Sequence, residues 1–336
     1  MSILAAGEAE NLRAQLLWAL AFLLIGAAAG ARLFRPGRVN LPERLPPHGS
    51  PWPMVVALLL GLGIWLMVPT AYYSLRGGRP AATRPVAPTP VPDATPATNQ
   101  DEPDLSTLPP ADLAFLMMVP HAAVFIGLAL FDRAIFGGRL ERLGLALRQL
   151  PRGAGMGLLG SVPAVPLVFG VSLAAEVVYR KLNYTHDAEH DLLRALGRSP
   201  SLIVSALLVL GATVAAPLSE ELLFRGHLQT LLRRVAARLS GMADPYLGPP
   251  LAGEEATTTT ASATPPAAWA TWVGIVATAA LFTAVHEAWT WPPIFVLAVC
   301  LGYAYERTGN LWAPITMHAA FNSVSTVVYL LVGPGG

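Results

Sequence analysis

The chain has 336 residues, of which 54% are apolar and only 13% are charged, and its formal net charge is +1. This charged share is about half that of ordinary soluble domains and could not cover the surface of a soluble protein of this length, so the composition indicates an integral membrane protein. The near-zero net charge argues against a nucleic-acid partner, which would require a basic patch. The single cysteine, Cys300, excludes a disulfide framework.

Apolar runs that could cross a lipid bilayer recur along the whole chain. A spanning helix needs about 20 mostly apolar residues. Most of the runs approach that length, but the run 294–305 is shorter and follows Pro292-Pro293. We therefore predict an all-α, polytopic membrane bundle of about eight transmembrane helices. The runs are 14–31, 53–73, 113–131, 155–175, 201–218, 267–285, 294–305 and 312–332.

Two stretches rich in Pro, Ala and Thr interrupt these runs and show no helical period. They predict a linker outside the membrane and a flexible loop. The predicted organisation is two transmembrane helices (1–75), an extramembrane linker (76–110), a third transmembrane helix with an amphipathic interfacial segment (111–154), and a core (155–332) with the flexible loop at 241–266.

The distribution of Lys and Arg predicts the orientation in the membrane. The loops after the first, third, fifth and seventh runs carry most of these residues, so they should face the cytoplasm and both termini should face outward. A second amphipathic run, which contains Arg233 and Arg234, predicts that His227 lies at the surface. Leucines at helical spacing among arginines predict a helix lying in the membrane surface, and they are Leu140, Leu143, Leu147 and Leu150.

Ionisable side chains inside apolar runs are costly and usually mark function, and here they gather after residue 201. Glu221 and Arg225 are four residues apart with the acid first, which is the favourable order for an ion pair. Adjacent helical residues point about 100° apart, so Glu220 should not share a partner with Glu221 and is left free to react. The alternative is a helix end that emerges among the headgroups, with both acids solvated.

Two further pairs repeat at a spacing of four residues. His318 and Asn322 share one face of the last run, where both side chains can donate hydrogen bonds. The alternative is that they only hold neighbouring helices together. Phe282 and His286 repeat in the same way on the sixth run, and without the other motifs His286 would be an ordinary residue at a helix end.

Three motifs in this order on successive apolar helices resemble those of the CPBP intramembrane protease family, which includes the CAAX proteases, the bacteriocin-processing proteins and the bacterial Abi proteins. The resemblance covers residues 155–332 and is closest to the type II CAAX prenyl endopeptidases. The motifs are Glu220-Glu221-x-x-x-Arg225, Phe282-x-x-x-His286 and His318-x-x-x-Asn322.

The resemblance implies an endopeptidase in a cell membrane, for which we expect the bacterial inner membrane, acting on a membrane-associated peptide or protein within the lipid bilayer. It implies that Glu220 is the general base on a water that His286 also holds, and that His318 and Asn322 stabilise the oxyanion. The supporting residues would be Glu221, Arg225 and Phe282.

Two alternatives remain open from the sequence. No cofactor is favoured, but zinc could be held by Glu220, His286 and His318 around an open water position. The second alternative is a non-catalytic membrane scaffold or a proton-coupled carrier that uses the same polar cluster. An internal inverted repeat would favour a carrier, and the polar residues gather only in the C-terminal half.

Overall fold

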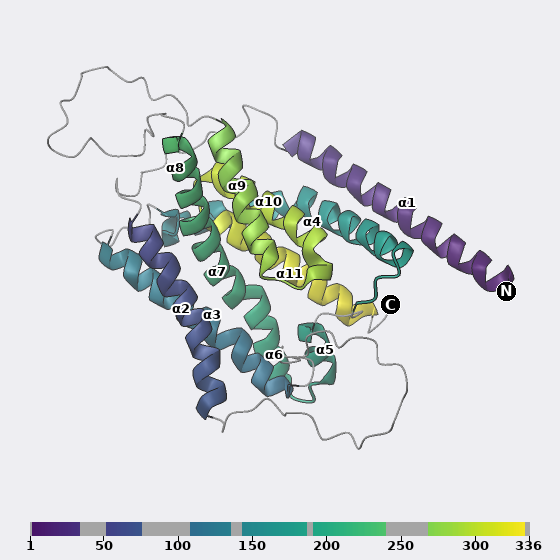
Figure 1. Ribbon diagram of the computed structural model, residues 1–336, viewed down its shortest axis with the longest axis horizontal. Coiled ribbons are helices and arrows are strands. Elements are labelled where there is room, and N and C mark those ends of the chain that lie inside the picture. The colour runs from purple at the N-terminus through teal and green to yellow at the C-terminus, as the bar shows by residue number, and fades with distance from the viewer. Residues whose placement is uncertain are drawn as a thin grey trace, which may run out of the picture.

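The computed structural model describes residues 2–33, 52–75, 108–135, 143–186, 191–239 and 268–332. In these ranges the chain folds into helices and contains no strand (Figure 1). The predicted flexible loop at 241–266 and nearly all of the predicted linker at 76–110 lie outside the described residues.

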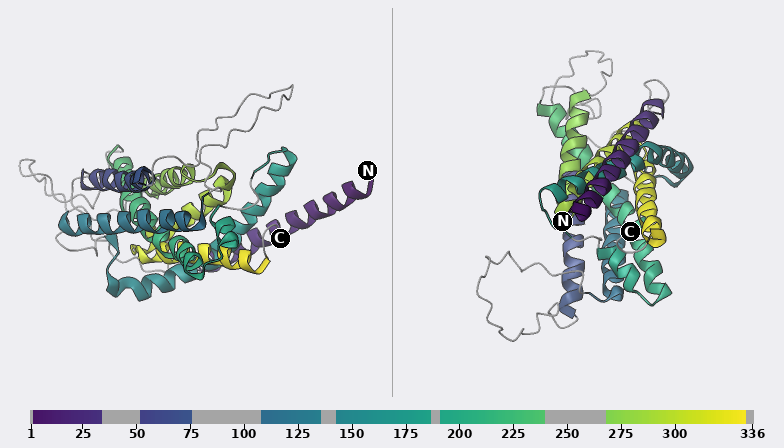
Figure 2. Two further views of the ribbon diagram at one scale, coloured as in Figure 1. Left: turned by 90° about the horizontal axis from the view of Figure 1, so that it is seen from below. Right: turned by 90° about the vertical axis from the view of Figure 1, so that its right-hand side faces the viewer.

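The N-terminal half supplies four long helices, which correspond to the first four predicted runs. They are α1 (Ser2–Leu33), α2 (Trp52–Leu75), α3 (Pro110–Ile135) and α4 (Leu150–Lys181). Helix α1 packs along α4, and its N-terminal end projects from the rest of the bundle (Figure 2). The two helices approach closely at Gly26, where an added Cβ would lie 2.8 Å from the carbonyl oxygen of Pro163.

The C-terminal half begins with a short helix, α5 (Asp191–Arg198), and continues with one long helical segment that changes its winding along its length. The segment consists of α6 (Leu202–Leu210), the π-helix η4 (Gly211–Ala215), α7 (Ala216–Glu221), the π-helix η5 (Leu222–Gln229) and α8 (Thr230–Leu239). The predicted fifth run, which ended at residue 218, is therefore only half of this helical segment, and the two acids that follow it are not at a helix end.

Three more helices complete the bundle: α9 (Ala268–Ala284), α10 (Trp291–Thr308) and α11 (Trp312–Val332). Helix α10 is longer than the predicted run 294–305, because Pro292 and Pro293 lie in its first turn. Proline is favoured there, since the N–H groups of a first turn have no partner within the helix. With its preceding turn, α10 is long and apolar enough to cross a membrane.

Within the described residues, six segments are long and apolar enough to cross a membrane, and α9 is a shorter apolar helix. Together with α11 they correspond to the eight predicted runs. The prediction of a polytopic, all-α membrane protein is confirmed. Which face is cytoplasmic stays a prediction.

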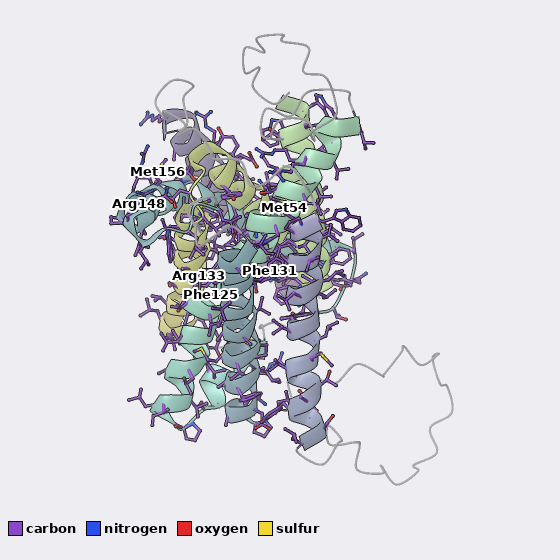
Figure 3. The ribbon with its side chains drawn as sticks, turned by 90° about the vertical axis from the view of Figure 1, so that its left-hand side faces the viewer. Met54, Phe125, Phe131, Arg133, Arg148 and Met156 are labelled. Atoms are coloured by element: carbon purple, nitrogen blue, oxygen red, sulfur yellow. The ribbon has the colours of Figure 1, made fainter. Side chains whose placement is uncertain are left out.

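A buried apolar cluster joins α2 and α3 to the C-terminal half. It includes Val124 and Leu128 of α3 and Leu222 of η5, and the side chains of Phe125 and Phe131, labelled in Figure 3, pack against it. Leucine 143 also belongs to this cluster, with only 1% of its surface exposed.

The predicted surface helix after α3 does not form as one helix. Gly144 has a φ of 75°, which ends any helix at that point, and its carbonyl oxygen accepts a hydrogen bond from the Leu311 N–H at 3.0 Å. A short 3-10 helix, η3 (Leu147–Gln149), then leads directly into α4. Leu143 lies in the core, Leu147 is exposed, and Leu140 lies outside the described residues. The regular spacing of these leucines therefore does not come from one helix: Leu143 is part of the buried apolar cluster, whereas Leu147 is exposed in η3.

Candidate active site

The two adjacent acids Glu220 and Glu221 lie near the middle of the long segment α6–α8, at the end of α7. Pro217 lies in the first turn of α7, and because proline has no N–H, the regular hydrogen-bond ladder is interrupted there. A π-helix lies on each side of α7. Such wide turns are frequent at functional sites, because they move side chains out of the regular helical register.

Glu221 is completely buried and forms the expected ion pair with Arg225. Its Oε1 atom accepts a hydrogen bond from Arg225 Nη1 at 2.9 Å, and neither side chain has any exposed surface. Arg225 Nη2 also donates to the carbonyl oxygen of Ala298 on α10 at 3.3 Å. The guanidinium lies over the ring of Phe282, 4.6 Å from its centroid. Arg225 thus links the acids to α9 and α10.

His318 of α11 lies between the two acids. Its Nδ1 atom is 2.9 Å from Glu221 Oε1, and its Nε2 atom is 3.9 Å from Glu220 Oε2. Our prediction that the acids cannot share a partner was wrong. The 100° spacing separates their directions, but an imidazole has nitrogens on two sides of its ring and can reach both carboxylates.

The two acids differ in their access to solvent or substrate. The side chain of Glu220 is 21% exposed, whereas that of Glu221 is fully buried. Because Glu221 already accepts from Arg225 and His318, Glu220 is the acid that can meet a water molecule or a peptide. This difference supports the assignment of the two roles that the spacing suggested.

His286 lies in the turn after α9 and is half-buried. Its Nδ1 atom is 2.7 Å from the carbonyl oxygen of Phe282, and since a carbonyl only accepts, Nδ1 carries the hydrogen. A neutral His286 therefore has its lone pair on Nε2. The Phe282 ring contacts both histidines, with centroid distances of 4.6 Å to His286 and 6.0 Å to His318.

Asn322 is one turn beyond His318 on α11. Its Nδ2 atom donates to the carbonyl oxygen of Ala212, in the π-helix η4, at 2.7 Å. The amide nitrogen has a second hydrogen, which this contact does not use. His318 and Asn322 thus face the same long helix, as their spacing predicts, and Asn322 also joins α11 to η4.

The sequence left open whether these residues hold a metal ion. Among the described residues, no three His, Cys, Asp or Glu side chains come together in a way that could hold one. Glu220, His286 and His318 all belong to these residues, so as arranged they do not form the zinc site that the sequence left open. Metal dependence itself stays a prediction for experiment.

The prediction that His227 lies at the surface was wrong, and Arg233 and Arg234 are buried as well. His227 is 1% exposed, and its Nε2 atom is 3.0 Å from Asp132 Oδ1 of α3. Arg233 forms an ion pair with Glu306 of α10 at 3.1 Å. Because the helix continues through the bundle rather than ending after Arg225, its charged residues find partners on neighbouring helices.

Sequence reasoning also missed a contact beside Glu220. His121 of α3 is buried, and its Nδ1 atom lies 2.8 Å from the hydroxyl oxygen of Ser219. The signal in the sequence was an ionisable residue inside an apolar run, directly after Pro120. Nothing in the sequence showed that α3 would pack against α7.

The comparisons with known proteins agree with this geometry. Residues 201–324 match the family model described as Type II CAAX prenyl endopeptidase Rce1-like. No curated protein and no solved structure matches the chain. The matched range runs from the start of α6 into α11 and contains all three motifs. The resemblance found in the sequence is thereby confirmed, since residues 201–324 are similar to the Rce1-like type II CAAX prenyl endopeptidases.

Proposed function

We propose that this protein is an intramembrane endopeptidase in which Glu220 activates the water that hydrolyses a peptide bond of a membrane-associated protein or peptide. The observation that carries the proposal is that Glu220 and Glu221, near the middle of a helical segment long and apolar enough to cross a membrane, meet His318 of α11. Ionisable groups at that depth are expensive, and a bundle that needed only to pack would not require them.

The geometry suits general-base catalysis. Glu220 takes a proton from a water whose oxygen bonds to the peptide carbonyl carbon, and the proton then passes to the leaving nitrogen as the C–N bond breaks. His286 has the right tautomer to assist, because its Nε2 lone pair can accept a hydrogen bond from the same water.

His318 can stabilise an oxyanion only when both nitrogens of its ring carry a hydrogen. Its Nδ1–H donates to Glu221, so in the neutral ring Nε2 carries a lone pair. When the ring is protonated, Nε2–H can donate to the negative oxygen, and the buried carboxylate of Glu221 offsets the positive charge. Asn322 contributes the hydrogen of Nδ2 that Ala212 does not use. Two donors held in advance are the usual means of stabilising this charge.

The first test is cleavage of a membrane-embedded peptide by the purified protein, with and without a metal chelator. We expect cleavage in both conditions, because the described side chains form no metal-binding group. Activity that is lost with the chelator and returns with zinc would contradict the metal-free mechanism. A protein that cleaves no peptide, whatever the metal, would favour the scaffold or carrier.

The second test concerns the two candidate oxyanion donors. His318→Ala and Asn322→Ala should each slow cleavage by about 10²–10³. The double variant should be little slower than either one, because the two donors act on one oxygen. Ser323→Ala is a matched control, since among the described residues Ser323 Oγ donates within its own helix, to Ala319 O at 2.7 Å. It should keep the wild-type rate.

The rates are measured beside the metal content and thermal stability of each variant. Small losses that add in the double variant would mean that His318 and Asn322 only join helices, as the Asn322 contact with Ala212 would by itself suggest. A stoichiometric metal that disappears only in His318→Ala would instead make His318 a metal ligand.

A further inference from the structure

The turn that carries His286 is held by residues that lie outside the matched range. Helix α4 ends at Lys181, before the family match begins at residue 201. Two residues at this end of α4 and just beyond it, Tyr179 and His186, contact Trp289, which lies three positions after His286. We call Tyr179, His186 and Trp289 the Trp289 clamp.

One contact of the clamp holds the backbone of the turn. The hydroxyl of Tyr179 donates a hydrogen bond to the carbonyl oxygen of Trp289 at 3.0 Å, across 110 positions of the sequence. A carbonyl oxygen only accepts, so the tyrosine hydrogen lies on this bond. The bond therefore ties a backbone atom of the turn to α4, whatever the conformation of the Trp289 side chain.

The second contact holds the side chain of Trp289. The ring of His186 stacks on the Trp289 ring, with the centroids 4.8 Å apart and the two planes at 5°. His186 is itself held by α4, since its Nε2 atom lies 3.0 Å from Glu176 Oε2. The Tyr179 ring lies edge-on to the His186 ring, with the centroids 5.4 Å apart. Both contacts of the clamp therefore depend on the C-terminal end of α4.

The turn connects the clamp to His286 over a short path. The carbonyl oxygen of His286 accepts a hydrogen bond from Trp291 Nε1 at 3.0 Å, so the turn closes back on the residue that it carries. On the side of α9, His286 Nδ1 donates to Phe282 O at 2.7 Å, and the Phe282 ring lies 6.0 Å from that of His318. The bond to Phe282 determines which nitrogen carries the hydrogen, and the clamp holds the turn in place.

We propose that Tyr179 is a positioning residue of the peptidase site, which through Trp289 keeps the Nε2 atom of His286 directed at the water that Glu220 activates. The inference rests on the proposed peptidase function. In this role Tyr179 touches neither the water nor the substrate. It acts only through His286, so the loss of its hydroxyl should slow cleavage only while His286 is present.

Tyr179→Phe removes one hydroxyl and keeps the ring in the clamp. We expect kcat to fall about tenfold with little change in KM, because a displacement of about 1 Å in a site can cost up to about 10² in rate. Tyr184→Phe is the matched control, since the Tyr184 ring lies 5.2 Å from that of Tyr179 and the side chain is 46% exposed. It should leave kcat and KM unchanged. Wild-type kcat in Tyr179→Phe would overturn the proposal.

A double-mutant cycle separates positioning from simple helix packing. His286→Ala should cleave about 10² more slowly than the wild type and remain measurable, since Glu220 is still present. In that background Tyr179→Phe should cause no further loss of kcat, because the group through which it acts is gone. An equal loss in both backgrounds would overturn the proposal, since the hydroxyl would then stabilise the whole site.

The His286 ring also reports on the clamp without any activity. In protein with ¹⁵N-labelled histidine, the His286 signal, assigned by its loss in His286→Ala, should shift in Tyr179→Phe and stay in place in Tyr184→Phe. If the wild type cleaves peptides and the signal does not shift in Tyr179→Phe, the role of Tyr179 is refuted and the proposed function stands. A wild type that cleaves no membrane peptide would instead refute the proposed function and, with it, this role of Tyr179, even where the signal shifts.

Discussion

Glu220→Gln should abolish peptide cleavage and leave the bundle folded. The amide keeps the size of the side chain but cannot take a proton from water, so we expect the rate to fall by about 10³ or more. Stability should change little, because Glu220 is partly exposed and its ion-pair contact, to His318, is long at 3.9 Å. The measurement is the cleavage rate of a membrane peptide beside the thermal unfolding temperature in detergent.

Glu287→Gln provides the matched control for the loss of a carboxylate near the site. Glu287 follows His286, is exposed, and accepts a hydrogen bond from Trp289 Nε1 at 2.6 Å. This variant should cleave at the wild-type rate. Full activity in Glu220→Gln, together with a folded but inactive Glu221→Gln, would reverse the assignment of the two acids.

Glu221→Leu should have the largest effect on stability. It leaves the Arg225 guanidinium buried without its carboxylate, and breaking a buried pair in this way costs about 3–5 kcal/mol. The double variant Glu221→Leu/Arg225→Met removes both charges and should recover most of that stability. It should remain inactive, since His318 loses the carboxylate that orients it. Unfolding in denaturant and the cleavage rate test the two parts separately.

The pair Glu176–Arg180 is a control with the same spacing but exposed side chains. Its atoms lie 2.8 Å apart, and the side chains are 32% and 48% exposed. Arg180→Met should therefore change the stability by no more than about 1 kcal/mol. If Glu221→Leu/Arg225→Met is as unstable as Glu221→Leu alone, the packing of the Arg225 side chain, rather than the balance of its charge, stabilises the site.

Local spacing predicted contacts between residues one helical turn apart. The Glu221–Arg225 pair and the shared face of His318 and Asn322 follow from the i, i+4 geometry and are present. The apolar runs located the helices, because a span of hydrocarbon requires a minimum length.

Contacts between helices could not be predicted in the same way. His318 and Glu221 are 97 positions apart in the sequence, and His121 and Ser219 are 98 apart. Helical periodicity predicts no contact at such separations. Hydropathy also ended the fifth run at residue 218, whereas the helical segment continues to Leu239 and buries Arg233 and Arg234 among protein partners. The π-helices on either side of α7 follow no simple composition rule.

The unbroken course from α6 to α8 also sets how far a substrate must travel. Glu220 lies near the middle of the apolar segment Leu202–Ala237, about 18 residues or roughly 27 Å from either end of the segment. An extended peptide advances about 3.3 Å per residue, so about eight residues of a peptide that runs along the segment reach from either end to the acid. Peptides with progressively shorter tethers between a charged anchor and the cleaved bond should therefore show a sharp length threshold, below which hydrolysis stops.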